Sequence, residues 1–208
     1  MRVLVACEYS GTVRDAFIRT GHDALSCDLR PTDVDGPHYQ GDVLDIIGDG
    51  WDLMIAHPDC TYLTNTGVCH LHRPDQTTPS LKGRPRWAAM DDAGRFFRKL
   101  LDCGIPKIAV ENPIPHKYAV ERIGRKYDQI IHPWQFGHPE KKATCLWLKE
   151  LPPLTPTDDV KEEMFELPKR DQQRLHYLSP SPDRWKLRST TFLGIATAMA
   201  DQWGHPTK

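Results

Sequence analysis

RVLVACEYSGTVRDAFIRTG, at residues 2–21, combines a strand pattern, a glycine turn and a helix pattern. Its first part, RVLVACE, is a short apolar run rich in valine, which predicts a buried strand. Val13, Phe17 and Ile18 then recur at helical spacing, and Gly21 stands where a helix would end. The segment therefore predicts a strand that is followed directly by a helix.

Strand and helix patterns continue to alternate after this segment. We predict further strands at residues 23–29, 51–58, 107–112 and 143–149, and further helices at 87–104 and 190–204. Residues 41–46 form either a short strand or a helical turn. Such alternation favours a mostly parallel sheet with helices on both faces. We therefore expect an α/β, Rossmann-like fold in a single domain over residues 1–208.

The composition limits the classes of function. The formal net charge is −1, so contact with nucleic acid would need a local basic face. The six cysteines are dispersed and form no CxxC pair, which argues against a zinc knuckle or a disulfide framework, and we assign no metal. No apolar run approaches the roughly 20 residues that span a bilayer, and the pattern of a signal peptide is absent. We expect no membrane association and no obligate protein partner.

Polar residues follow the first predicted strands, where sheets of this class bind ligands. Glu8-Tyr9-Ser10-Gly11 lies between the first strand and its helix, and the glycine would let the backbone approach a ligand closely. Asp28 suits the hydroxyls of a ribose, and Asp42 could accept from an adenine amino group. Each residue alone is more often a turn or a cap. Together they favour an adenosine-type ligand, while the absence of GxGxxG and GxxxxGK[ST] disfavours a dinucleotide or a P-loop site.

Two reactive side chains follow later strands. Cys60 stands in a loop stiffened by Pro58, and Glu111 and Asn112 end the next strand. Each alone is more often structural. A thiolate and a glutamic acid that reach one cleft suit a particular reaction: addition of sulfur to carbon 6 of a pyrimidine, with a proton given to ring nitrogen 3, makes carbon 5 nucleophilic. We expect the apolar surroundings to raise the pKa of Glu111, which suits that role.

Seven segments, in order, resemble motifs of the DNA cytosine-5 methyltransferases. They are ACEYSG, SCDL, GDVLD, AHPDCTYLT, ENP, FGHPEKKATCLWL and FLGIATAMADQWG. The first three resemble the cofactor motifs of that family, the fourth its Gly-Gly-Pro-Pro-Cys-Gln loop and the fifth its Glu-Asn-Val segment. The sixth resembles the Tyr-Gly-x-Pro-Gln-x-Arg-x-Arg segment with its following strand, and the seventh the C-terminal motif. The ordered set touches most of the chain and is more specific than any single motif.

The resemblance implies an S-adenosylmethionine-dependent methyltransferase fold and methylation of cytosine carbon 5 in DNA through a covalent bond from Cys60 to carbon 6. The cofactor would be S-adenosyl-L-methionine, its product S-adenosyl-L-homocysteine, and the partner DNA that contains cytosine. Glu111 would contact the ring, Asn112 would brace the Cys60 loop, and Lys142 would be the cation that remains of the two arginines. The methyl-donor site would comprise Glu8, Tyr9, Ser10, Gly11, Asp28, Leu29, Asp42, Val43, His57 and Pro58.

The chain departs from the family pattern in three ways. Asp59 replaces the second proline of the nucleophile loop, and a carboxylate there should raise the pKa of the thiol and repel phosphate. Glu140, Lys142 and Thr144 stand at the three named positions of Gln-x-Arg-x-Arg. Only residues 152–188, where we expect irregular structure, replace a long target-recognition region. This size suits a compact phage or prophage enzyme in the cytoplasm of a bacterium or an infected host cell.

The long loop at residues 61–86 is the best candidate for a DNA-facing element, because long loops are usually functional or mobile. Its basic residues suit phosphate contact. We predict DNA contacts from Arg73, Lys82, Arg84 and Arg86. A solvated, mobile loop explains the same residues equally well.

Three alternatives stay open. The same chemistry on single-stranded DNA or on a free cytosine nucleotide would explain the small recognition region. A catalytically degenerate relative that only binds DNA or the cofactor would explain Asp59. Transfer of a modified donor group would place Asp59 or Lys142 beside the altered group.

Overall fold

A computed structural model describes residues 1–205 and is built around one seven-stranded sheet. The strands are β1 (Arg2–Ala6), β2 (Asp23–Asp28), β3 (His38–Gln40), β4 (Leu53–Ala56), β5 (Lys107–Pro113), β6 (Gln129–Ile131) and β7 (Thr144–Lys149). Their order across the sheet is β3-β2-β1-β4-β5-β7-β6. The pairs from β3 to β5 are parallel, whereas β7 runs antiparallel to both β5 and β6.

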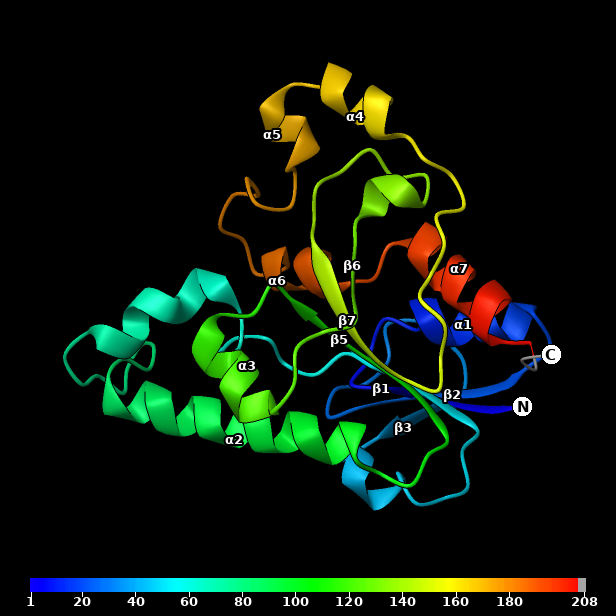
Figure 1. Cartoon of the computed structure of the whole chain (residues 1–208), viewed down its shortest axis with the longest axis horizontal. Coiled ribbons are helices and arrows are strands. Elements are labelled where there is room, and N and C mark those ends of the chain that lie inside the picture. Colours follow the sequence, from blue (N-terminus) through cyan, green and yellow to red (C-terminus); the bar gives the residue numbers. More distant parts are fainter. Residues whose placement is uncertain (206–208) are drawn as a thin grey trace.

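Helices cover both faces of this sheet. The helices of the described chain are α1 (Thr12–Arg19), α2 (Arg84–Leu101), α3 (Lys117–Ile123), α4 (Lys161–Glu166), α5 (Lys169–Gln172), α6 (Arg184–Ser189) and α7 (Leu193–Trp203). Short 3₁₀ helices are η1 (Val43–Asp45), η2 (Asn65–His72) and η3 (Pro133–Gln135). In Figure 1, α1 and α7 lie together on one side of the sheet, and α2 with α3 on the other. The predicted α/β, Rossmann-like fold with a mostly parallel sheet is confirmed.

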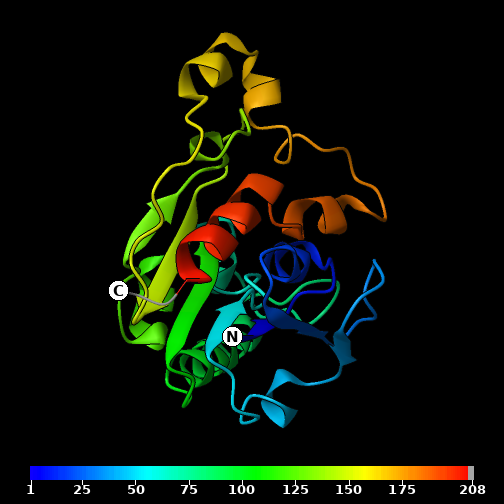
Figure 2. The same ribbon diagram turned by 90° about the vertical axis from the view of Figure 1, so that its right-hand side faces the viewer.

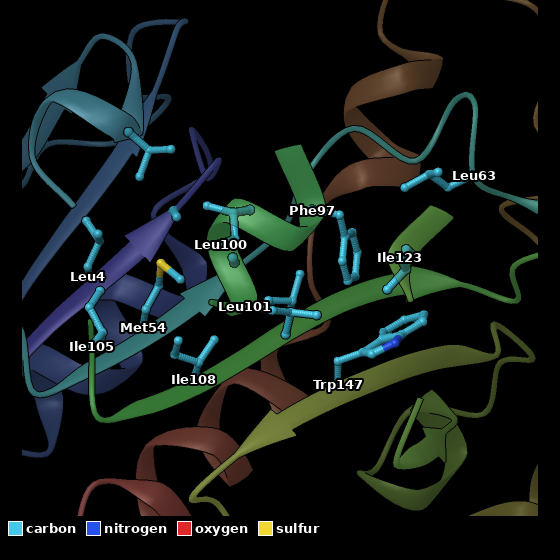
Figure 3. Close-up of a cluster of buried hydrophobic side chains, with 14 of the residues drawn as sticks. Leu4, Met54, Leu63, Phe97, Leu100, Leu101, Ile105, Ile108, Ile123 and Trp147 are labelled. Atoms are coloured by element: carbon cyan, nitrogen blue, oxygen red, sulfur yellow. The ribbon is translucent and has the colours of Figure 1, made fainter. Parts of the chain in front are cut away.

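The central strands are apolar on both faces, as strands covered from two sides must be. Leu4, Met54 and Ile108 point toward α2, where they meet Phe97 and Leu100 (Figure 3). The alternate residues of the same strands join a second cluster with α1 and α7. Burying each such side chain contributes roughly 1.5–3 kcal/mol, so the two clusters together hold the sheet between its helices.

The direction of β7 decides which residues reach the functional edge of the sheet. Thr144 begins β7 and pairs with Pro113, the last residue of β5. Because the two strands are antiparallel, the start of β7 lies beside the end of β5. Lys142, two residues before β7, is therefore carried to the edge where the parallel strands end.

Several elements differ from the sequence prediction. The strands β3 and β6 and the helix α3 were not predicted, because strands of three residues and a helix of seven carry little periodic pattern. Residues 41–46 contain the helical turn η1 and no strand. Within the predicted loop at 61–86, η2 forms a 3₁₀ helix and α2 begins at Arg84. Residues 152–188 are not wholly irregular, since they contain α4, α5 and the first part of α6.

Residues 150–192 form an excursion that leaves the sheet after β7 and returns at α7. Figure 2 shows its tip, with α4 and α5, standing away from the sheet. Its base is fastened, because Trp203 Nε1 donates to the carbonyl of Pro152 at 2.9 Å and Asp158 bridges to Phe136. Within residues 1–205, no helix combines the length and the apolar character that crossing a bilayer requires.

Candidate active site

A cavity of about 150 Å³ opens at the edge where the parallel strands end. Five parts of the chain line it: the β1–α1 loop, the segment after β4, the end of β5, the start of β7, and α6 with the residues that follow it. Its lining residues are Cys7, Glu8, Tyr9, Ser10, His57, Pro58, Asp59, Cys60, Glu111, Pro113, Lys142, Thr144, Arg188, Ser189 and Thr191. Three of the four residues predicted to be catalytic therefore meet in one cavity.

Cys60 lies in a tight turn just after β4. Its carbonyl accepts from the backbone N–H groups of Leu63 at 3.1 Å and Thr64 at 3.0 Å, which closes the turn. The next residue, Asn65, donates its N–H to the carbonyl of Ile114 at 2.9 Å. The loop is thus tied to the chain that continues from β5, and its thiol is held toward the cavity.

Asp59 shapes this turn and changes the thiol beside it. Its Oδ1 accepts from the N–H of Thr61 at 2.9 Å and from the Thr61 hydroxyl at 2.5 Å. Burial raises the pKa of the Cys60 thiol, and the carboxylates of Asp59 and Glu111 raise it further, while Lys142 opposes them. A raised pKa means less thiolate at neutral pH, and the thiolate is the nucleophile.

We expect Asp59→Asn to increase the reactivity of Cys60. Asparagine keeps an acceptor for Thr61 but removes a negative charge, so the thiol pKa should fall and the thiolate fraction at pH 7 should rise about three- to tenfold. The rate of alkylation by iodoacetamide against pH measures this without any substrate. Asp59→Glu keeps the charge and serves as the matched control, and an alkylation profile that is identical in all three proteins would contradict the prediction.

Glu111, on β5, is paired with a buried histidine at the end of β4. His57 Nδ1 lies 3.2 Å from Glu111 Oε1, and the two side chains are 8% and 21% exposed. Burial alone would raise the pKa of Glu111, but the charge of the adjacent His57, followed by the charge of Lys142, leaves it below its usual value. The predicted raised pKa of Glu111 is therefore wrong, because the sequence showed the apolar strand but not the histidine beside it.

Lys142 lines the cavity and also contacts α6. Its Nζ donates to the carbonyl of Arg188 at 2.9 Å. Tyr9 makes a second connection, because its hydroxyl lies 2.7 Å from Ser189 Oγ and its ring packs against Trp185 with centroids 5.2 Å apart. Figure 1 shows α6 beside the ends of β5 and β7. The end of this short helix therefore forms part of the cavity wall, next to Tyr9 and Lys142.

The β1–α1 loop brings some of the predicted donor-site residues to the cavity but not all of them. Glu8, Tyr9 and Ser10 line the cavity, whereas Gly11 does not. Glu8 is buried, and its carboxylate accepts from the N–H groups of Val13 at 2.7 Å and Arg14 at 3.2 Å, so it caps the start of α1. Gly11 has φ +72°, a left-handed conformation that favours glycine at this turn.

The remaining donor-site residues lie around the ends of β2 and β3. Asp28 Oδ1 accepts from the N–H of Arg30 at 2.9 Å, and Asp42 Oδ1 accepts from the N–H of Leu44 at 3.0 Å, which caps the start of η1. Both carboxylates lie close to the Cys7 thiol, whose pKa is raised to about 12 by burial first and by Asp28 and Asp42 after it. Because Cys7 lines the cavity, this acidic strip adjoins it.

Besides Gly11, Asp28 and Asp42, three more residues predicted at the site do not line the cavity. Leu29 is exposed and Val43 is packed in the core. Asn112 is also buried, and its Nδ2 donates to the carbonyl of Pro113 at 2.5 Å, so no contact of this side chain with the Cys60 loop is seen. The backbone of Ile114 ties that loop down in its place. His57 and Pro58, in contrast, do line the cavity.

The four residues predicted to contact DNA differ in how far their side chains are exposed. Arg73 is exposed and Lys82 partly so, and the Arg84 side chain is 91% exposed and paired with Asp75 at 2.5 Å. Arg86 is buried: its Nη2 donates to the carbonyl of Thr61 at 2.8 Å and its guanidinium lies over the ring of Tyr62. The prediction that Arg86 faces DNA therefore has to be corrected, because in this structure it supports the fold of the loop.

Sequence reasoning missed part of the cavity. Cys7, Thr144, Ser189 and Thr191 line it without having been predicted to do so. Thr144 follows from the direction of β7, which apolar patterns do not reveal. Ser189 and Thr191 reach the cavity through the excursion at 150–192, and no spacing in the sequence indicates where that excursion returns.

The cavity is large enough for only part of the expected methyl donor, S-adenosyl-L-methionine. Its volume is below the roughly 300–1,000 Å³ of a pocket that encloses a whole drug-sized ligand. The acidic strip at Asp28 and Asp42 continues from it along the strand ends, where ribose and adenine could bind outside the cavity. Within residues 1–205, no group of three or more histidine, cysteine or acidic side chains is arranged to hold a metal ion.

Comparison with known proteins gave structural neighbours only. No family model matches the chain, and no curated protein matches it. Among solved structures, a candidate DNA modification methyltransferase encoded within a prophage of E. coli aligns with a TM-score of 0.48 and 15% identity, over 81% of this chain and 56% of that one. The Dnmt2 methyltransferase of S. pombe aligns with a TM-score of 0.44 and 15% identity, over 88% of this chain and 61% of that one. The chain thus spans less than two thirds of the length of either neighbour.

Proposed function

We propose that this protein is an S-adenosylmethionine-dependent methyltransferase that modifies carbon 5 of cytosine in DNA. The single observation that supports this most is the meeting of Cys60, Glu111 and Lys142 in one cavity. These side chains come from three separate segments, and the ordered motifs assign all three to one reaction centre. A purely structural cysteine and glutamate would have no reason to share a cavity with this lysine.

The residues of the cavity have distinct roles in this proposal. The Cys60 thiolate forms a bond to carbon 6 of the ring while the ring's double-bond electrons move toward carbon 5. Glu111 holds the ring at nitrogen 3 and the exocyclic amino group, and a proton reaches nitrogen 3 as negative charge develops there. Lys142 compensates the negative charges of Glu111 and the thiolate. After methylation, loss of the carbon 5 proton expels the Cys60 thiolate.

The proposed donor site extends from the cavity along the ends of β1, β2 and β3. When bound, S-adenosyl-L-methionine would supply an electrophilic methyl group. Tyr9 would line the reacting end of that site, and Asp28 and Asp42 would accept hydrogen bonds from the ribose and the adenine. In their present contacts these two carboxylates each retain an oxygen that no hydrogen bond described here uses.

The proposed DNA partner would meet exposed basic side chains on both sides of the cavity. Arg73 and Arg84 lie on the segment around η2 and the start of α2. On the other side, Arg170 and Arg174 line a hollow beside Tyr177, whose ring is half exposed. Basic side chains with an accessible ring suit phosphate contact and base stacking. Two such surfaces could hold a strand across the cavity.

We expect the protein to form a covalent complex with DNA that contains 5-fluorocytosine. Fluorine at carbon 5 blocks the final elimination, so the bond from Cys60 to carbon 6 would persist through denaturing electrophoresis. The incubation uses mixed-sequence DNA and labelled S-adenosyl-L-methionine, with nucleoside analysis of unmodified DNA in parallel. Labelled 5-methylcytosine is the expected product.

Separate incubations with duplex, single strand and free nucleotide distinguish the substrates. A product only from single strand or nucleotide would replace duplex DNA as the substrate and keep the chemistry. Binding of DNA without adduct or product would mean that the protein is a catalytically degenerate relative of these enzymes. The raised pKa of Cys60 is the observation that favours this alternative. A labelled nucleoside other than 5-methylcytosine would indicate a modified donor group.

A further inference from the structure

His57 occupies an unusual place for a histidine. Its backbone N–H donates to the carbonyl of Ala6 at 2.9 Å, which fixes it between the ends of β1 and β4. Its side chain lines the cavity and is 8% exposed, with Nδ1 3.2 Å from Glu111 Oε1. Neither ring nitrogen has a well-aligned hydrogen-bond partner within the described part of the chain. Buried polar atoms are rarely left in that state without a functional reason.

A second buried histidine shows what a structural role looks like in the same protein. His116 Nδ1 accepts from the N–H of Ala119 at 3.1 Å, and its Nε2 lies 3.3 Å from the carbonyl of Tyr62. Both of its nitrogens are used, and the residue caps α3. His57 caps no helix, and its ring packs against the carboxylate of Glu111 at the proposed reaction centre. Its surroundings therefore favour the charged form of the imidazole.

Charged and titratable groups from several elements line the cavity beside His57. Glu111 on β5 and Glu8 on the β1–α1 loop favour the imidazolium, and Lys142 before β7 opposes it. Asp59 and Cys60 lie on its own loop, and Arg188 on α6 lines the same cavity. Burial alone would lower the pKa of His57, but Glu111 and then Glu8 leave it raised. The two opposite pKa shifts favour a proton on His57 and an ionised Glu111.

The position of the proton in the His57–Glu111 pair matters for the proposed methyl transfer. The inference that follows rests on that proposed function. Ring nitrogen 3 has to receive a proton as sulfur adds to carbon 6, and an ionised Glu111 has none to give. We propose that His57 and Glu111 share one proton and act as a unit, in which His57 is the positioning residue that supplies the proton through Glu111. Its charge also holds the Glu111 carboxylate in place in the cavity.

The proton balance is closed over one turnover. As the bond from Cys60 to carbon 6 forms, the proton leaves His57 Nδ1 for the Glu111 carboxyl group, and that group passes it to nitrogen 3. His57 is then neutral and Glu111 is ionised again. When the carbon 5 proton is lost to solvent and the thiolate leaves, nitrogen 3 gives its proton back through Glu111, and His57 regains its charge.

The first test observes the pair without turnover. NMR of histidine-labelled protein should show His57 titrating above its ordinary value of about 6.5 in the wild type. In Glu111→Gln this titration should move down, because burial then acts with less opposition. His22, at the opposite edge of the sheet, provides the matched control, and its titration should not move. A His57 titration that is unchanged in Glu111→Gln would overturn the shared proton.

The second test uses the pH dependence of methyl transfer. Wild-type kcat should fall as pH rises through the folded pKa of His57, because the shared proton is lost. His57→Gln should lower kcat at pH 7 about 10- to 100-fold, leave the KM for S-adenosyl-L-methionine within about twofold and remove that alkaline limb. His22→Gln should behave as wild type. In the Glu111→Gln background, adding His57→Gln should cost little more, because the two residues act together.

The outcomes separate this inference from the proposed function. Turnover and a trapped adduct in the wild type, with the same pH profile in His57→Gln, would overturn the role of His57 and keep the function. No turnover and no adduct would overturn both, whatever the NMR titration shows. Loss of the alkaline limb together with the NMR shift would support the shared proton.

Discussion

Cys60→Ala is expected to abolish the covalent complex with 5-fluorocytosine DNA and to lower methyl transfer by about a thousandfold or more. Without the sulfur no bond to carbon 6 forms, and carbon 5 stays a poor nucleophile. Cys60→Ser should fare little better, since a hydroxyl beside Asp59 and Glu111 has still less tendency to ionise than the thiol. Denaturing electrophoresis detects the adduct, and nucleoside analysis the product.

Two controls make this result specific. Cys69→Ala removes an exposed thiol in η2 that does not line the cavity, and it should leave both readouts unchanged. The Cys60→Ala protein should keep its thermal midpoint within a few degrees, because the turn is closed by backbone groups. Persistence of the adduct in Cys60→Ala would assign the nucleophile elsewhere and end the proposed mechanism.

The second large effect concerns stability and comes from Arg14. This side chain on α1 is fully buried. Its Nη1 donates to Ser26 Oγ at 3.2 Å, its Nη2 to the carbonyl of Asp35 at 3.2 Å, and its Nε to Asp15 Oδ1 at 2.8 Å. Further donations reach Thr32 Oγ1 and the carbonyl of Val34. One guanidinium thus fastens the loop between β2 and β3 to the first helix.

We expect Arg14→Leu to lower the free energy of unfolding by about 3–5 kcal/mol, because the substitution leaves buried acceptors without donors. Arg14→Lys should recover little of this, since an ammonium lacks the planar fork that reaches several acceptors at once. Urea denaturation measures the change, and proteolysis within residues 29–37 would report the freed loop. Arg19→Leu, on the same helix but exposed, should stay within about 0.5 kcal/mol of wild type. An Arg14→Leu protein as stable as that control would refute the assignment.

Some of the site was predictable because parallel strands end at one edge. Cys60 and Glu111 each follow an apolar run, and neighbouring parallel strands place such residues together. Lys142 was assigned by resemblance alone, and its presence in the cavity depends on the reversed direction of β7. Hydrophobic patterns do not distinguish a parallel from an antiparallel strand when both faces are buried.

Other features could not be predicted because they depend on contacts distant in sequence. His57 was expected only as a donor-site residue, and its pairing with Glu111 reverses the expected pKa shift of that carboxyl. Ser189 and Thr191 reach the cavity from the far end of the excursion. Arg86 stands in a basic stretch whose other members are exposed or partly exposed, and only the structure shows that it is buried against Tyr62.

The way the excursion at 150–192 is fastened has an evolutionary consequence. Its first end is held at the base by the contacts of Pro152 with Trp203 and of Asp158 with Phe136, and its second end by the contacts of Arg188 with Lys142 and of Ser189 with Tyr9. Insertions at the tip, among α4 and α5, would lengthen the chain between fixed anchors, and the entropy of a longer surface loop rises only slowly with its length. Descendants of this chain could therefore exchange one recognition module for another while the sheet and its reactive groups stay as they are.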